Sequence, residues 1–327
     1  MSRPVVLSGA AVAVAALILA ALVVGEQALP VADVLAALTG RDASPATAMI
    51  VTGFRLPRAL LAALVGAALA VAGAVSQAVM RNPLAEPGLL GINAGAALAA
   101  LCVLVLRPAT PALWLPWAAS AGALAMALAI YALSWRGGAS SARIILIGIG
   151  LSALAGAGAG MITAFGEVSA VQRAMVWLSG SLADSRWIRV WTTAGWLVLP
   201  VAFVLLSARE LDLLAYSDDT ARSLGQRVEL ARALMMLGCT LISGAAVAAA
   251  GLIGFVGLIA PHLARRLAGP RHGGSVPLAA LLGAVLVLAA DILGRTVIAP
   301  AELPAGIVTA LIGAPFFGWL MWRARNG

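Results

Sequence analysis

The chain has 327 residues, of which 62% are hydrophobic and only 10% are charged, whereas soluble domains contain about 45–50% apolar and about 25% charged residues. Together with a mean hydropathy of +1.03, these values exclude a water-soluble globule and an intrinsically disordered chain, and they indicate a membrane protein. Because one crossing of the hydrocarbon core takes about 20 residues, the length allows roughly ten crossings and leaves no room for a large soluble domain.

All 21 basic residues are arginines, and the formal net charge is +8. A chain without lysine cannot form a Walker A phosphate-binding loop or a Schiff base, so nucleotide energy has to come from another polypeptide. The arginines lie scattered between apolar runs without interleaved stacking aromatics, which argues against nucleic acid as a partner. The two histidines and two cysteines have no spacing typical of a metal or catalytic site, so we expect no enzymatic activity and no bound metal or cofactor in this chain.

Ten apolar runs follow one another along the chain. They cover residues 5–24, 57–80, 90–106, 112–134, 143–165, 190–207, 230–248, 251–264, 276–298 and 303–322. The first run is longer than the roughly 7–15 residues of a signal-peptide core, which predicts a retained span. The run at 251–264 is short and rich in glycine. The sequence therefore predicts an all-α polytopic membrane protein with about ten transmembrane helices, short loops and a single transmembrane domain over residues 1–327.

The arginine distribution predicts the orientation of these spans. If the N-terminus lies inside, ten crossings return the C-terminus to the inside, and the inner segments then hold thirteen of the 21 arginines, Arg136 among them, against eight on the outside. This bias has the sign of the positive-inside rule. We therefore expect both termini on the cytoplasmic side of the membrane.

Small residues are frequent inside the spans. Gly148, Gly150, Gly156, Gly158 and Gly160 lie along one predicted helix, and such residues let helices approach closely where lipid provides no hydrophobic drive. A glycine-lined pathway is the alternative interpretation. A pattern of two glycines also recurs in 58–75 and 232–247, which run in opposite directions in the predicted topology. This echo is typical of the inverted repeats of transporters and predicts inverted-repeat-like halves.

The longest hydrophilic segment on the inner side spans about residues 208–228. Within it, Ser217-Asp218-Asp219-Thr220 followed by Gly225 is typical of the N-cap and first turn of a short helix that stops at glycine, with an acidic metal site as the less favoured alternative. The mixture of charged residues and leucines is compatible with two interpretations. The segment either forms amphipathic helices that offer a docking face to a cytosolic partner or is a solvated connector.

Asp291 is the only carboxylate well inside a predicted span. Asp291 lies four residues before Arg295, so both occupy one helix face and can form an ion pair, with a coupling-ion site as the alternative. Arg55 and Arg58 flank the mouth of the second span. Arginines on the outer surface run against the positive-inside bias. They either bind carboxylates of an acidic external partner or make local interactions such as salt bridges.

Four long motifs occur in order along the chain. They are RLPRALLAALVGAALAVAGAVSQAVMRNPLAEPGLLGINAGAALA at Arg55–Ala99, MVWLSGSLADSRW at Met175–Trp187, GLIGFVGLIAPHLAR at Gly251–Arg265 and AELPAGIVTALIGAPFFGWL at Ala301–Leu320. Together they resemble the FecCD family, the permease subunits of ABC importers for ferric siderophores, haem and cobalamin. The similarity extends from about residue 25 to the C-terminus, and the run at Trp177–Leu182 resembles the ferric-siderophore branch.

The resemblance implies a permease of the bacterial cytoplasmic (inner) membrane that moves a ferric siderophore by alternating access. Haem or cobalamin is the alternative cargo. The implied partners of the permease are a second permease copy or a paralogue, two ABC ATPase subunits that bind ATP and magnesium, and a periplasmic or lipid-anchored substrate-binding protein. An ion-coupled secondary transporter is less favoured, because it needs intramembrane carboxylates beyond Asp291.

The resemblance also implies roles for particular residues. Arg55, Arg58 and Arg295 match the arginines that receive acidic residues of the binding protein. The segment that contacts the ATPases corresponds to Ala215, Ser217, Asp218, Asp219, Ala221, Arg222, Leu224 and Gly225. The pathway and inner gate correspond to Asn82, Leu84, Ser140, Ser141, Gly148, Gly156 and Gly160. At Ala142 some relatives have a hydroxyl residue, so the sequence departs from a polar gate there.

Overall fold

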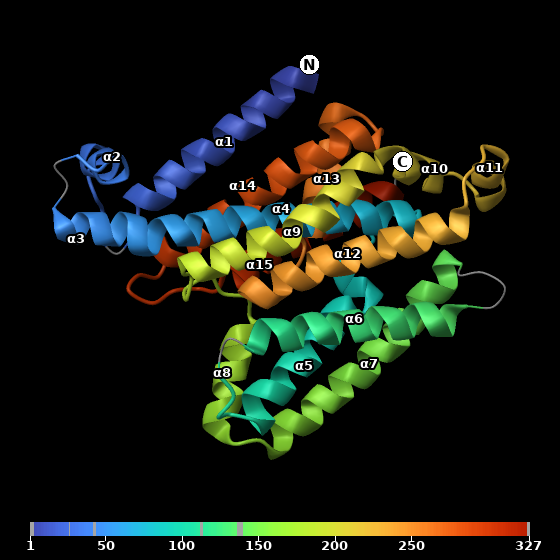
Figure 1. Ribbon diagram of the computed structural model, residues 1–327, viewed down its shortest axis with the longest axis horizontal. Helices are drawn as coiled ribbons and strands as arrows, with labels where there is room; N and C mark the ends of the chain where they lie inside the picture. The colour runs from blue at the N-terminus through green and yellow to red at the C-terminus, as the bar shows by residue number, and fades with distance from the viewer. Residues whose placement is uncertain (1–2, 26, 42–43, 112–113, 136–139, 326–327) are drawn as a thin grey trace.

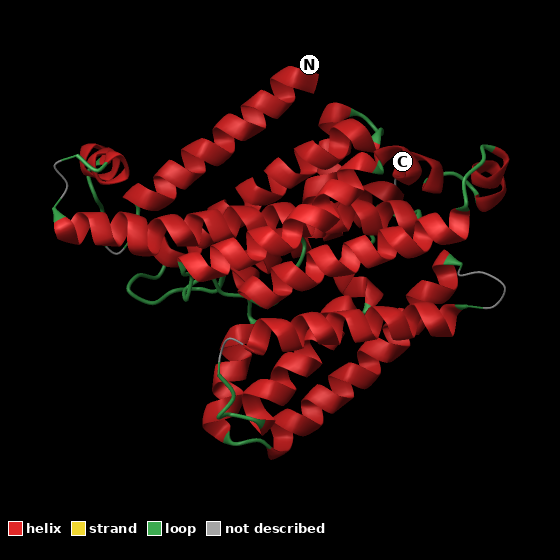
Figure 2. Cartoon of the chain, viewed as in Figure 1, coloured by secondary structure: helices red, strands yellow, loops and turns green. Residues whose placement is uncertain are grey.

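A computed structural model of the protein describes residues 3–25, 27–41, 44–111, 114–135 and 140–325, and helices fill most of these ranges (Figure 2). The helices are α1 (Arg3–Val23), α2 (Val31–Thr39), α3 (Pro45–Ala48), the π-helix η1 (Met49–Arg55), α4 (Leu56–Met80), the 3-10 helix η2 (Pro87–Leu90), α5 (Ile92–Leu106), α6 (Leu115–Ser134), α7 (Ser141–Phe165), α8 (Val168–Leu178), α9 (Trp187–Leu206), α10 (Ala208–Leu214), α11 (Asp218–Ser223), α12 (Val228–Ala250), α13 (Val256–Ala268), α14 (His272–Thr296) and α15 (Ala305–Arg325). Arg136, assigned to the inner side from the sequence, lies outside the described residues.

Nine of the ten apolar runs correspond to single helices with ends close to those expected from the sequence. Within the described residues, eight helical stretches are long and apolar enough to cross a membrane. They are α1, the continuous stretch Pro45–Met80, α6, α7, α9, α12, α14 and α15. α5 is apolar but has only 15 residues. The chain is therefore an all-helical, multi-pass membrane protein.

The run at 251–264 is not one helix, which corrects the sequence-based boundary. Gly251 has a φ of 73° and Phe255 a φ of 67°, and these left-handed residues keep the intervening segment out of the helix. α13 then begins at Val256 and has 13 residues. At 1.5 Å per residue it is about 20 Å long, shorter than the roughly 30 Å hydrocarbon core.

The helices α4 and α12 form the centre of the bundle. In the most apolar window of each helix 78% of the residues are buried, against 17% for α7. α14 and α13 pack along α4, while α6 and α9 pack along α12. Figure 1 shows α4 and α12 running in opposite directions, and it shows α5, α6, α7 and α8 as a separate layer. This layer contacts the rest mainly through α6 on α12, with smaller contacts of α5 on α12 and of α7 on α4.

Glycines set the distance between α4 and its two neighbours. A Cβ atom added at Gly66 would lie 2.2 Å from the carbonyl oxygen of Gly283 in α14. One added at Gly73 would lie 2.0 Å from the carbonyl oxygen of Gly257 in α13. No side chain fits at these positions, so the helix backbones touch directly, as small residues allow in membranes.

We expect Gly66→Ala to destabilise the fold by about 1–3 kcal/mol, because the new methyl group forces α4 and α14 apart. The measurement is thermal unfolding of the purified protein in detergent. Gly195→Ala is the matched control, since a Cβ atom at Gly195 in α9 meets nothing within 4 Å. Equal melting temperatures for the two variants would contradict the close-contact argument.

Candidate functional site

Ion pairs gather at two opposite ends of α4. One group, here called the Arg58 end, consists of Arg58, Asp291, Arg295 and Glu302. The other, here called the Asp218 end, surrounds Asp218 where α11 meets the last residues of α4. The predicted docking, coupling and gate residues lie in or near these two groups, so each group is described in turn.

At the Arg58 end, the buried carboxylate of Asp291 lies between two guanidinium groups. Arg58 donates from Nε to Asp291 Oδ1 at 3.0 Å, and Arg295 Nε lies 3.2 Å from Asp291 Oδ2. The side chain of Asp291 is 3% exposed. The pairing of Asp291 with Arg295 on one helix face is thus confirmed. Because both oxygens already face arginines, the surroundings of Asp291 oppose a bound cation.

Arg58 has a second acidic partner. Its Nη1 and Nη2 atoms donate to the two carboxylate oxygens of Glu302 at 3.0 and 2.9 Å, in a bidentate pair. Glu302 lies in the loop between α14 and α15 and is 35% exposed. It was not predicted, because no local sequence signal connects residues 58 and 302.

Arg55 and Arg295 bind the C-terminal end of α1. Arg55 Nη1 donates to the carbonyl oxygens of Leu22 and Val23 at 2.7 and 3.1 Å. Arg295 donates to the carbonyl oxygens of Val24 and Ala21, both at 3.4 Å. The last carbonyls of a helix lack intrahelical partners, and these arginines supply them. The three predicted docking arginines thus lie at one end of the bundle and are all held by their own chain, while their docking role remains a prediction.

The predicted short helix at the Asp218 end is confirmed as α11. Ser217 is its N-cap and accepts the backbone N–H of Thr220 at 3.2 Å. Asp218 and Asp219 occupy its first turn, where acidic residues favour the helix dipole. Gly225, with a φ of 86°, follows the helix in a conformation that glycine adopts without strain.

Asp218 attaches α11 to both central helices. Its carboxylate pairs with Arg81 at the end of α4 and accepts a hydrogen bond from Arg232 Nη2 in α12 at 2.8 Å. Arg81 also donates to the carbonyl oxygen of Leu214 at 2.9 Å. Burial raises the pKa of Asp218, but the hydrogen bonds and charges of Arg81 and Arg232 outweigh it and hold the pKa below its ordinary value. These arginine contacts join residues far apart in sequence and were missed.

Further contacts hold the same segment. Asp212 Oδ1 accepts the backbone N–H of His272, the first residue of α14, at 2.8 Å. Gln226 donates to the carbonyl oxygen of Glu210 at 2.9 Å. The predicted coupling residues divide by exposure. Ala221 is buried and Asp218 half-buried, whereas Ala215, Ser217, Asp219, Arg222, Leu224 and Gly225 are exposed. α11 therefore has one face on the bundle and one exposed face, on which Arg222 pairs with Asp219 and Glu229.

The two predicted gate turns meet near the end of α4. Ser141 Oγ donates to the carbonyl oxygen of Val79 at 3.0 Å, and Ser140 accepts the backbone N–H of Arg143 as the N-cap of α7. Asn82 accepts the backbone N–H of Leu84 at 2.9 Å and so fixes the turn that leaves α4. Ser141 thus contacts the last turn of α4 at Val79, and Val79 lies three residues before Asn82.

The predicted glycine row of α7 divides in two. Gly148 is buried, and its carbonyl oxygen lies 3.2 Å from a Cβ atom added at Gly91. Cβ atoms at Gly156 and Gly160 meet nothing within 4 Å, and both residues are exposed. Gly148 therefore serves helix contact, while Gly156 and Gly160 lie on a face of α7 that no described part of this chain covers.

Glu86 is a buried acid that the sequence reasoning missed. It lies just before η2, and its Oε2 accepts the backbone N–H of Phe255 at 3.2 Å. Burial raises the pKa of Glu86, and the hydrogen bond from Phe255 only partly opposes this. The contact attaches the turn after α4 to the start of α13. The only local sequence signal was that Glu86 is followed by Pro87 and Gly88, a dipeptide that marks a turn.

The comparison with known families identifies the chain. Residues 13–323 match the model of the FecCD transport family. The chain belongs to the FecCD family. It is therefore a permease subunit of an ABC importer, and the ATPase that drives it is a separate subunit. Such a permease works with ATPase and substrate-binding partners.

Relatives and a solved structure agree with this assignment. The iron(3+)-hydroxamate import system permease protein FhuG of Bacillus subtilis (strain 168) is 39% identical, over 85% of this chain and 84% of its own length. The hemin transport system permease protein HmuU of Yersinia pestis is 42% identical, over 83% of each chain. A metal-chelate type ABC transporter solved in an inward-facing conformation superimposes with a TM-score of 0.88 at 30% identity, covering 98% of this chain and 99% of that one.

We expect Asp291→Asn to destabilise this FecCD permease strongly, by about 3–5 kcal/mol, because it leaves two buried arginines with less compensating charge. The check is thermal unfolding in detergent. Glu302→Gln is the matched control and should cost much less, since Glu302 is half-exposed and Arg58 keeps Asp291. An Asp291→Asn protein as stable as Glu302→Gln would contradict this description.

We also expect Asp218→Asn to loosen α11. The pKa of Asp218 lies below its ordinary 3.8, so its ionised form holds α11 in place above that pH, and the contribution is lost as the pH falls through the lowered pKa. The protection factors of residues 208–228 in hydrogen–deuterium exchange, each taken relative to the intrinsic exchange rate at the same pH, should therefore fall in wild type as the pH drops below 3.8 and be low already at pH 7 in the variant. Asp219→Asn, at a 98% exposed carboxylate, is the control and should leave exchange at pH 7 nearly unchanged.

Proposed function

We propose that this permease carries a ferric siderophore across the bacterial cytoplasmic membrane, paired with a second permease copy or a paralogue and driven by two ATPase subunits. The main support for the cargo is the similarity to the iron(3+)-hydroxamate permease over 85% of the chain. The run at Trp177–Leu182, which resembles the ferric-siderophore branch, agrees with it. Haem is the second candidate, because the hemin permease of Yersinia pestis is 42% identical.

We propose that the Asp218 end faces the cytoplasm. Thirteen of the 21 arginines fall on that side in the predicted topology, as the positive-inside rule expects. Arg3 donates to the carbonyl oxygen of Ala268 at 3.1 Å, so α1 begins beside the end of α13. Arg266 of α13 lies 5.7 Å from the ring centre of Trp319, which places the C-terminal part of α15 nearby. Both ends of the chain would then be cytoplasmic.

The proposed mechanism couples the ATPases to the gate through α11. The exposed side chains of Asp219, Arg222 and Leu224 are the contact face for an ATPase. When ATP binding closes the ATPase pair, α11 moves, and its Asp218 contacts transmit the movement to Arg81 and Arg232. α4 then shifts at the end where the gate turns meet, and the permease exchanges its inward- and outward-facing forms.

At the opposite end, the proposed partner is the substrate-binding protein, which is periplasmic or lipid-anchored. Arg55, Arg58 and Arg295 carry the positive charge that its acidic side chains would meet. Glu302 is the exposed partner of Arg58, while Asp291 is buried. An incoming carboxylate would therefore replace Glu302 and leave the Asp291 pairs in place.

The test is uptake of radio-iron presented as a panel of ferric siderophores, with haem and labelled cobalamin in parallel, in a deletion strain and in the same strain restored with this gene. We expect loss and rescue for an iron chelate, and dependence on the Walker lysine of the partner ATPase. Loss of haem or cobalamin uptake alone would replace the proposed cargo. Uptake that persists without a functional ATPase would contradict the proposed mechanism.

The same assay separates docking from folding. Arg55→Gln leaves the Asp291 ion pairs intact but removes the hydrogen bonds to the end of α1, so uptake is expressed per folded permease in the membrane, and we expect this value to fall. Arg41→Gln, an exposed arginine before the π-helix, is the matched control and should transport normally. Full uptake by Arg55→Gln would remove this residue from the proposed docking surface.

A further inference from the structure

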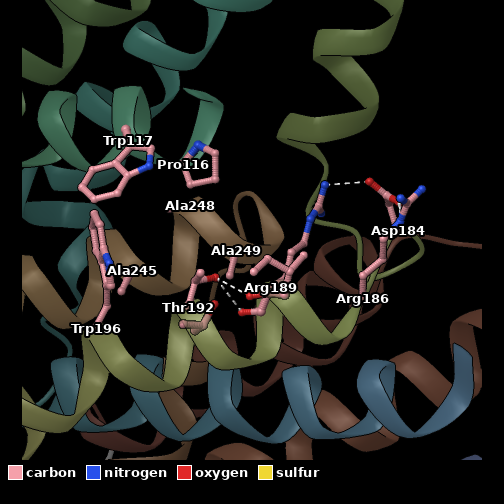
Figure 3. Close-up of a pocket in the computed structure, with 12 residues that line it drawn as sticks. Pro116, Trp117, Asp184, Arg186, Arg189, Thr192, Trp196, Ala245, Ala248 and Ala249 are labelled. Atoms are coloured by element: carbon pink, nitrogen blue, oxygen red, sulfur yellow. Dashed lines mark hydrogen bonds and ion pairs between the residues drawn. The ribbon is translucent and has the colours of Figure 1, made fainter. Parts of the chain in front are cut away.

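A cavity of about 330 Å³ lies between α6, α9 and α12, apart from the residues discussed above (Figure 3). Its floor is formed by the small side chains of Ala245, Ala248 and Ala249 on α12. Trp117 of α6 and Trp196 of α9 stand beside it, with ring centres 4.6 Å apart in an edge-to-face arrangement. The interior of the cavity is therefore mostly apolar and aromatic. Thr192 and Thr193 of α9 also line it, and the Thr192 hydroxyl already donates to the carbonyl oxygen of Ile188 at 2.8 Å.

The cavity lies at the Arg58 end of the bundle. α9 begins at Trp187, whose indole N–H donates to the carbonyl oxygen of Thr52 in η1 at 2.8 Å. The lining residues come from the first turns of α6, the first half of α9, the last turns of α12 and the segment just before α9, which contributes Asp184 and Arg186. Tryptophans are enriched at membrane–water interfaces, so this position corresponds to the boundary between headgroups and hydrocarbon.

The rim of the cavity carries two arginines and one aspartate and therefore a net positive charge. Arg189 Nη2 donates to Asp184 Oδ2 at 2.7 Å, and Arg186 Nε lies 3.5 Å from Asp184 Oδ1. Figure 3 shows these three side chains beyond the alanine floor, with Arg189 directed towards Asp184. Two guanidinium groups share one carboxylate, which leaves one positive charge. Arg186 is 77% exposed and available to a ligand.

We propose that this cavity binds a phospholipid with an anionic headgroup. Its phosphate lies at Arg186 and Arg189, where the excess positive charge attracts it. One acyl chain lies on the alanine floor beside Trp117 and Trp196, because an apolar hollow at this depth is in contact with hydrocarbon. The bound chain fills the space between α6 and α9, which pack on α12 on either side of the cavity.

This site is independent of the transported cargo, and its test uses the intact permease without transport. The protein, purified in mild detergent, is incubated with phosphatidylglycerol or phosphatidylcholine and examined by native mass spectrometry. We expect one retained phosphatidylglycerol per chain. Retention should weaken about five-fold for each arginine removed in Arg186→Gln and Arg189→Gln, since an arginine near an anionic lipid contributes about 1 kcal/mol.

Control variants distinguish lipid held in this cavity from lipid held elsewhere on the protein. Arg173→Gln removes an exposed arginine of α8 outside the cavity and should retain the lipid fully. Ala248→Phe fills the floor and should abolish retention while the protein still elutes as a folded species. Equal retention of phosphatidylcholine, or displacement by millimolar inorganic phosphate, would overturn the proposal of an anionic lipid. A change of oligomeric state in Ala248→Phe without any bound lipid in wild type would assign the cavity to a second copy.

Discussion

At Gly66 and Gly73 the backbone of α4 touches α14 and α13 with no side chain between them, and the arrangement of both polar ends depends on this contact. α4 carries Arg58 near its first residue and is followed by Arg81 directly after its last. With 25 residues it is about 37 Å long. A single buried helix thus connects the cluster around Asp291 with the attachment of α11, and close packing keeps it from bending between them.

Local patterns predicted the features that depend on neighbouring residues. The α11 cap needs only Ser217 and the residues after it, and the Asp291–Arg295 pair needs only one helix turn, so both could be predicted. The pairs of Arg58 with Glu302 and of Arg81 with Asp218 join residues more than 130 positions apart, and no periodicity indicates them. The break before α13 was hidden for another reason, because Phe255 is a bulky residue in a conformation that sequence patterns assign to glycine.

The glycine patterns show how one motif can serve different purposes. In the first of the two echoing segments, Gly66 and Gly73 touch neighbouring backbones. In the second, a Cβ atom at Gly238 would meet only side chains, the nearest at 3.5 Å, and one at Gly244 would meet the Ala123 side chain at 3.4 Å and the Ser120 backbone at 3.9 Å, all ordinary contact distances. α4 and α12 do run in opposite directions at the centre of the bundle, as the predicted inverted repeat requires, yet their glycines do not make equivalent contacts (Figure 1).

The cluster around Asp291 also has an electrical consequence. Two arginines and two carboxylates sum to zero, so the membrane potential exerts no net force on these four side chains together. A unit charge moved across the whole membrane changes in energy by about 2.3 kcal/mol per 100 mV. Neutralising either carboxylate would leave one uncompensated positive charge in the electric field of the membrane. The energy of that end of α4 would then depend on the membrane potential.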